Sequence, residues 1–263
     1  MTENKKFKLV SSKKTRYLLP NILTLGGVCL GISSIKFSID GNYSLAVIFI
    51  LFAAILDALD GRIARLIKGT SEFGKELDSL TDFVSFGIAP VFILYFWELN
   101  KYGKLGWAIT LVYSVCCVLR LARFNLTKID NNQNWKNNYF EGIPSPAGGL
   151  LILMPLIYEL ADLNLNLNIV EMTPYFTVCV AFLLVSKIPT FSLKKISVSS
   201  KATVFILLIM GTIFISLLYY TFKALLIFGL AYLISIPVSF IIYRNKNKKQ
   251  ISELSDDEHE DVL

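Results

Sequence analysis

Long apolar blocks, rather than alternating apolar and polar residues, constrain this chain more than any other feature. A helix needs roughly 17–25 mostly apolar residues to cross a bilayer. The segments that meet this requirement are 18–37, 43–62, 78–98, 105–124, 146–162, 173–190, 202–220 and 222–243. The chain is 54% hydrophobic and 17% charged, whereas soluble domains average about 45–50% and about 25%. We therefore predict an all-α integral membrane protein with about eight transmembrane helices.

Positive charge is distributed unevenly between the two ends of these segments. With the N-terminus placed inside, 22 of the 26 Lys and Arg residues fall on the cytoplasmic side, and only Lys36, Lys101, Lys104 and Lys223 fall outside. Cytoplasmic loops of membrane proteins carry such an excess, so we expect both termini in the cytoplasm of a multi-pass protein in the cell (inner) membrane. The net charge of +6 indicates anionic lipid as a partner and not nucleic acid.

The cysteines and the histidine exclude two classes of site. All four cysteines lie inside apolar blocks, where they are small apolar residues and not the paired loop cysteines of a secreted framework. The single histidine, His259, lies in the acidic C-terminal tail. Histidine catalysis and histidine metal ligation are therefore excluded.

Four aspartates flank the connection between the second and third apolar segments. Asp57 and Asp60 end one predicted helix, in AAILDALDGRIARL, and Asp78 and Asp82 begin the next, in GKELDSLTDFVSFG. Spacings of three and four residues place each pair on one helix face, and both helix ends meet at the cytoplasmic side. We therefore expect the two pairs to face each other across a small gap.

Clustered carboxylates at the edge of a bilayer need a compensating positive charge. A central Asp costs about 2.5–3.5 kcal/mol even on a lenient insertion scale. Oxygen-only ligands favour Mg²⁺ or Mn²⁺, and two such ions held together stabilise the attacking and leaving oxygens of phosphoryl transfer. The alternative, helix capping or pairing with Arg62 and Arg65, explains any two of the aspartates but explains all four poorly.

Small residues beside the aspartates indicate close approach of a ligand. Gly61 lies inside a helical pattern, where glycine costs about 1 kcal/mol relative to alanine and often marks such an approach. Ala64 lies on the same face and leaves a slot for a flat base, while Arg65 can reach phosphate oxygens. Gly74 precedes the third helix, where a turn or close backbone approach is needed.

The string from Asp57 to Asp82 resembles the signature of the CDP-alcohol phosphotransferases. It reads D-x2-D-G-x2-A-R-x8-G-x3-D-x3-D, with every fixed position present. The blocks LPNILTLGGVCLG, RLARFN, GIPSPAGG and SKIPTFSLKKI resemble the membrane-type phosphatidylserine synthases of bacteria and archaea within this family. The resemblance implies a six-helix catalytic core, usually in a homodimer, with two divalent cations and a CDP-linked donor at the cytoplasmic face.

Under this resemblance the chain divides into four parts. Residues 1–17 are a basic juxtamembrane segment, 18–190 the six-helix core, 191–243 an additional helix pair, and 244–263 a charged tail that we expect to be disordered. Apolar sequence continues almost unbroken through the helix pair and is too long for one span, so we predict a tight hairpin there.

The resemblance also implies roles for individual residues. The predicted metal ligands are Asp57, Asp60, Asp78 and Asp82, and Asp82 is also the general base. The predicted residues for the donor, CDP-diacylglycerol, are Asn21, Thr24, Gly61, Arg65, Ser71 and Gly74. Capping of a helix that starts after Pro20 is an equal alternative for Asn21 and Thr24. The candidate residues for the acceptor, L-serine, are Arg120, Arg123, Asn125 and Ser145.

Other functions stay open at this stage. Transfer to glycerol 3-phosphate or an inositol phosphate would use the same chemistry, and the arginines near the acceptor do not exclude a phosphate. Stop-transfer charges bound to lipid headgroups are the structural alternative for those arginines. A secondary transporter also combines many spans with membrane acids, but its site lies near the midplane, between repeats. Here all four acids lie at one edge and the halves show no convincing repeat.

Overall fold

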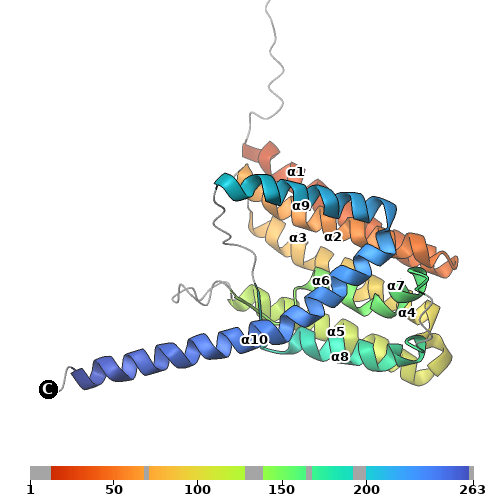
Figure 1. Ribbon diagram of the computed structural model, residues 1–263. Helices are drawn as coiled ribbons and strands as arrows, with labels where there is room; N and C mark the ends of the chain where they lie inside the picture. The colour runs from red at the N-terminus through yellow and green to blue at the C-terminus, as the bar shows by residue number, and fades with distance from the viewer. Residues whose placement is uncertain (1–12, 68–70, 128–138, 164–167, 192–199, 261–263) are drawn as a thin grey trace, which may run out of the picture.

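The computed structural model describes residues 13–67, 71–127, 139–163, 168–191 and 200–260, which are almost entirely helical (Figure 1). The α-helices are α1 (Lys13–Ile39), α2 (Tyr43–Leu66), α3 (Glu72–Asp82), α4 (Ala89–Trp97), α5 (Lys104–Thr127), α6 (Ser145–Ile152), α7 (Met154–Leu160), α8 (Thr173–Val185), α9 (Ser200–Tyr219) and α10 (Thr221–Glu260). Short helical segments are η1 (Phe83–Ile88), η2 (Leu99–Tyr102) and η4 (Val170–Met172). Strands β1 (Tyr139–Glu141) and β2 (Pro189–Phe191) pair antiparallel, with Tyr139 opposite Phe191.

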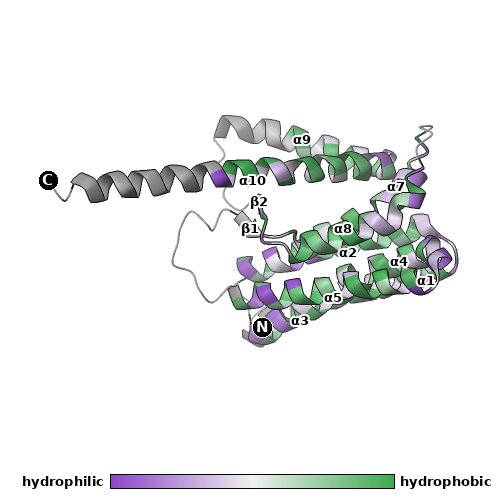
Figure 2. Cartoon of the chain, turned by 90° about the horizontal axis from the view of Figure 1, so that it is seen from below, coloured by the Kyte–Doolittle hydropathy of each residue, from purple (hydrophilic) through white to green (hydrophobic). Residues whose placement is uncertain are grey.

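Five helical stretches in the described part of the chain are long and apolar enough to cross a membrane. They are Leu18–Ile39, Tyr43–Leu66, Glu72–Trp97, Lys104–Leu126 and Thr221–Arg244. Figure 2 shows apolar residues along the middle of these helices and polar residues gathered toward their ends. The all-α, multi-pass membrane fold is therefore confirmed, while the number of eight spans and the position of the termini stay predictions.

Two of the predicted spans are shorter than expected. The segment 146–162 is not one helix, because α6 ends at Ile152 and α7 begins at Met154. Pro155, near the start of α7, has no N–H to donate to the preceding turn, and its ring crowds that turn. The segment 173–190 is helical only to Val185, because Ser186 is extended and leads into β2.

The C-terminal helices match the predicted hairpin but continue past it. Helix α9 ends at Tyr219 and α10 begins at Thr221, which places the break where the sequence predicted it. Helix α10 then runs to Glu260 and so extends through residues 244–260 of the tail, whose disorder stays a prediction. Residues 238–260 contain neither proline nor glycine, and nothing in that stretch ends a helix once it has formed.

A π-helical segment follows Asp82 within the third span. Segment η1 connects α3 to α4 as one continuous helical run. The hydroxyl of Tyr113 donates to the carbonyl of Phe86 at 3.0 Å, and the hydroxyl of Ser114 donates to the carbonyl of Gly87 at 3.3 Å. Side chains from α5 thus donate hydrogen bonds to two carbonyls of the π-helical segment. The turn after Asp82 is therefore held by its neighbours.

Candidate active site

The predicted aspartate cluster forms at the end of the bundle where α2 ends and α3 begins. One oxygen each of Asp57, Asp60 and Asp78 lies within 4.8 Å of the others. Asp60 is buried, whereas Asp57 and Asp78 are half-buried. The short connection between the two helices therefore brings Asp57 and Asp60 of the first pair together with Asp78 of the second pair, while Asp82 lies outside this group of three.

Helix α1 supplies a hydroxyl to this cluster. Thr24 is buried, and its hydroxyl donates to Oδ2 of Asp60 at 2.7 Å, with the carbonyl of Pro20 as an alternative acceptor at 3.0 Å. The alternative of helix capping is wrong for Asn21 and Thr24, because α1 begins at Lys13. Instead, both residues lie within the helix, on a face that meets the ends of α2 and α3.

A pocket of about 130 Å³ lies beside the cluster between α1, α2 and α3. Its lining residues are Pro20, Asn21, Thr24, Asp60, Gly61, Ala64, Ser71, Gly74, Lys75 and Asp78. Five of the six predicted donor residues line it. The sixth, Arg65, is exposed in the last turn of α2 and does not line the pocket. Among the described residues, a Cβ atom built on Gly61 would meet nothing within 4 Å, so the missing side chain leaves open space in the pocket.

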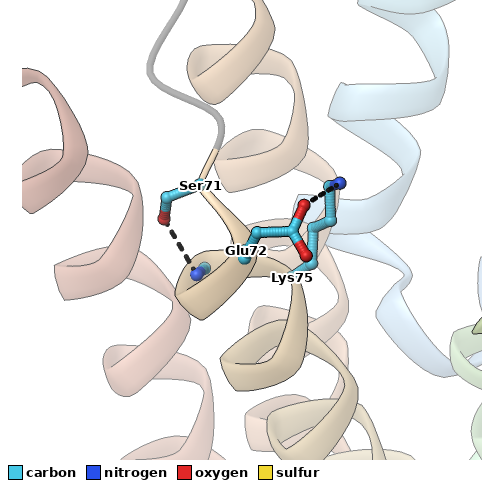
Figure 3. A network of polar contacts seen from close by, with 4 residues as sticks. Ser71, Glu72 and Lys75 are labelled. Carbon is cyan, nitrogen blue, oxygen red and sulfur yellow. Dashed lines mark hydrogen bonds and ion pairs between the residues drawn. The ribbon is translucent and has the colours of Figure 1, made fainter.

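Ser71 and Gly74 shape the pocket wall at the start of α3. The Ser71 hydroxyl accepts a hydrogen bond from the Gly74 N–H at 2.9 Å and so caps the helix (Figure 3). A Cβ atom on Gly74 would lie 3.1 Å from the Ser71 hydroxyl and 3.2 Å from the Asn21 side-chain oxygen. Glycine therefore permits α3 to begin close against α1 at this point.

Lys75 is a pocket residue that the sequence reasoning missed. Its ammonium pairs with the carboxylate of Glu72 at 3.1 Å on an exposed surface (Figure 3). Such exposed pairs contribute little to stability. The sequence could have indicated Lys75 as a pocket residue, because it lies one helical turn before Asp78 in the same motif.

The fourth aspartate, Asp82, is held from two other helices. The Ser145 hydroxyl donates to Oδ2 of Asp82 at 2.7 Å, and Nη1 of Arg120 donates to the Ser145 oxygen at 2.7 Å. The Arg120 guanidinium also lies 5.5 Å from the ring centre of Phe124. Oδ1 of Asp82 is buried and accepts no hydrogen bond from the described residues. Among the described residues, a hydroxyl therefore holds one oxygen of Asp82, and the carboxylate of Asp57 lies beside Asp82.

The other two candidate acceptor residues contact neighbouring helices. Nη1 of Arg123 donates to the carbonyl of Val185 at 2.6 Å and joins α5 to the end of α8. The Asn125 amide donates to the Ser79 hydroxyl at 3.0 Å and joins α5 to α3. Of the four predicted acceptor residues, Arg120 and Ser145 are joined to Asp82 by hydrogen bonds.

The residues at this site fit hard divalent cations. The candidate metal ligands are carboxylate oxygens, which Mg²⁺ and Mn²⁺ prefer. Within the described residues, no Lys or Arg forms an ion pair with Asp57 or Asp60. Oδ1 of Asp82 is buried without a hydrogen-bond donor among the described residues, so it is a further oxygen that a cation would satisfy. The metal prediction is thus supported by an acidic cluster, and the identity and number of ions stay predictions.

The chain is similar in sequence to one known protein family and to several proteins that share one name. Residues 17–183 match the family model described as CDP-alcohol phosphatidyltransferase. The chain is 34% identical over 235 residues to a protein of Helicobacter pylori named CDP-diacylglycerol–serine O-phosphatidyltransferase, a match that covers 88% of this chain and 97% of that protein. A protein with the same name in Mycobacterium bovis is 37% identical over 182 residues, a match that covers 69% of this chain and 63% of that protein. A protein with the same name in Bacillus subtilis is 34% identical over 142 residues, a match that covers 54% of this chain and 77% of that protein.

Proposed function

Because the chain belongs to the CDP-alcohol phosphatidyltransferase family, we propose that it transfers the phosphatidyl group of CDP-diacylglycerol to L-serine. The products are phosphatidylserine and CMP. The observation that carries the proposal is the aspartate cluster beside a pocket built from the predicted donor residues. The names of the Helicobacter, Mycobacterium and Bacillus relatives support serine as the acceptor.

The pocket is the proposed site of the cytidine diphosphate group. Gly61 and Ala64 leave room for a flat base on α2, and Asn21 and Ser71 offer polar atoms from the facing helices. Arg65 stands outside the lining and is proposed to contact phosphate oxygens at the rim. The acyl chains of the donor would extend between helices into the bilayer.

Asp57, Asp60, Asp78 and Asp82 are proposed to hold two divalent cations, Mg²⁺ or Mn²⁺. When bound, such ions neutralise charge on the donor pyrophosphate and on the departing CMP. The hydroxyl oxygen of serine forms a bond to the phosphatidyl phosphorus, and the bond from that phosphorus to the CMP oxygen breaks. Asp82 takes the hydroxyl proton as general base. Thr24 holds the Asp60 carboxylate in place throughout.

The setting of the reaction follows from the charge pattern. Because the predicted eight-span topology puts 22 of the 26 Lys and Arg residues on one side, we propose an active site that faces the cytoplasm from the inner membrane. Anionic lipid is the proposed partner of this basic side. Assembly as a homodimer, which the family resemblance implies, is likewise proposed and can be checked by cross-linking in native membranes.

The deciding experiment measures CMP release by the purified protein in detergent with CDP-diacylglycerol and Mn²⁺. L-serine, glycerol 3-phosphate, an inositol phosphate and no acceptor are supplied in parallel. Release that depends on serine, together with formation of phosphatidylserine, supports the proposal. Release only with another acceptor would retain the donor site and overturn serine as the acceptor. No release with any of them would contradict transferase activity.

A further inference from the structure

Ser145 is a buried hydroxyl whose single hydrogen is committed to Asp82. It is the first residue of α6 and is 0% exposed. The Arg120 guanidinium has only donors, so the Ser145 oxygen must accept from Arg120 and donate its hydrogen to Asp82. The hydrogen bonds therefore run in one direction, from Arg120 to Ser145 to Asp82.

This hydrogen bond makes the two oxygens of Asp82 unequal. Rotation of an aspartate carboxylate about its last side-chain bond is broad, so a carboxylate with no partner can exchange its oxygens. The Ser145 hydroxyl holds Oδ2 at 2.7 Å, while Oδ1 is buried with no hydrogen bond from the described residues. Oδ1 is thus the oxygen left to meet a ligand.

The backbone around Ser145 is held close to the segment that follows Asp82. Gly149, one helical turn after Ser145, lies against η1, because a Cβ atom there would be 3.1 Å from Cβ and 3.2 Å from Cα of Phe86. Gly148 packs against Leu184 of α8, where a Cβ atom would lie 2.7 Å from a methyl carbon of the leucine side chain. Helix α6 therefore has little freedom to shift along η1, and the Ser145 hydroxyl stays in register with the Asp82 carboxylate.

We propose that Ser145, itself held by Arg120, positions the Asp82 carboxylate for proton removal and does not bind the acceptor. This inference rests on the proposed function, since it assigns Asp82 the role of base. Ser145 acts through Asp82, and Arg120 acts through Ser145. Reaction rates depend steeply on the placement of the reacting groups, so loss of this restraint affects the chemical step and not the affinity for serine.

The test compares Ser145→Ala with wild type and with a matched control, Ser38→Ala. Ser38 is also buried, and its hydroxyl donates to the carbonyl of Ile93 at 3.4 Å near the opposite end of α1. Ser145→Ala is expected to lower kcat about 10- to 100-fold while the KM for serine changes by less than about twofold. Ser38→Ala is expected to leave both constants unchanged. A raised KM with normal kcat, or no change in either, would overturn the proposal.

A double-mutant cycle tests the route through Ser145. Arg120→Lys alone is expected to lower kcat, but Arg120→Lys in the Ser145→Ala background is expected to add no further loss, because the two residues act as one unit. Independent, multiplying losses would overturn the route. If Ser145→Ala is not monodisperse in detergent, Arg120→Lys alone still gives the comparison of kcat with KM.

Mn²⁺ affinity, measured by electron paramagnetic resonance, is a readout that needs no turnover. Loss of a residue that orients a metal ligand weakens metal binding about 10- to 100-fold, so Ser145→Ala is expected to bind Mn²⁺ more weakly than Ser38→Ala. If the wild-type protein turns over no acceptor, the proposed function fails and the Mn²⁺ measurement decides the positioning role alone. Equal Mn²⁺ affinity in the two variants would then overturn it.

Discussion

Gly61→Ala is expected to stabilise the protein and to weaken donor binding at the same time. Gly61 lies inside α2, six residues before Ile67, the C-cap residue of that helix. A Cβ atom there would meet no atom of the described part of the chain within 4 Å, and Gly61 lines the pocket of about 130 Å³. The added methyl group therefore harms no packing and takes space only from a ligand.

The two effects have different sizes and separate readouts. Alanine is favoured over glycine inside a helix by about 0.8–1 kcal/mol, which raises the Tm of a protein of this size by about 2–4 °C. A methyl group forced into a filled site costs about 1–3 kcal/mol, which corresponds to roughly 5- to 150-fold weaker binding of CDP-diacylglycerol. Tm is measured by thermal unfolding in detergent, and donor KM by CMP release.

Gly211→Ala is the matched control. Gly211 lies inside α9, and a Cβ atom there would also meet no described atom within 4 Å, but Gly211 does not line the pocket. It is expected to gain stability with no change in donor KM. If Gly61→Ala binds the donor as well as wild type does, the pocket is not the nucleotide site. If Gly61→Ala lowers Tm, the position is not open.

Three further changes test the metal site and the packing around it. Thr24→Val removes the hydroxyl that donates to Asp60 and is expected to cost about 1–3 kcal/mol of stability and to weaken Mn²⁺ binding, measured by titration; unchanged Mn²⁺ affinity would contradict a role for this bond. Asp60→Ala is expected to abolish CMP release, and near-normal turnover by this variant would refute the metal scheme. Excess chelator is also expected to abolish CMP release by the wild-type protein, and added Mg²⁺ or Mn²⁺ should restore release after chelation but not in the variant. Gly149→Ala pushes a methyl group against the Phe86 backbone and is expected to destabilise by about 1–3 kcal/mol, seen as a lower Tm; an unchanged Tm would show that α6 can move.

The sequence predicted the features that depend on short stretches of chain. Apolar blocks of sufficient length indicate spanning helices, because every backbone polar group in a bilayer must be satisfied within its own segment. The aspartate cluster was predictable for a related reason, since residues three and four apart share a helix face. A short connection between the two helices then brings Asp57 and Asp78 close together.

Helix ends were less predictable. The breaks at Leu153 and Ser186 shorten two expected spans, although both segments are as apolar as their neighbours. Hydropathy measures transfer from water and says little about where a proline interrupts the backbone. The helix over 244–260 shows the converse, because a charged composition indicates solvent exposure and does not by itself prevent helix formation.

The sequence by itself determined that this chain crosses membranes, that its acids gather at one end, and that the family motif is complete. Only the tertiary structure shows which side chains form hydrogen bonds with the aspartates. Ser145 follows Asp82 by 63 residues and Arg120 precedes Ser145 by 25, and no local period relates such positions. Their contact exists because glycines let α6 and η1 approach until a hydroxyl reaches a carboxylate. That distance is set by packing, which a list of residue types does not contain.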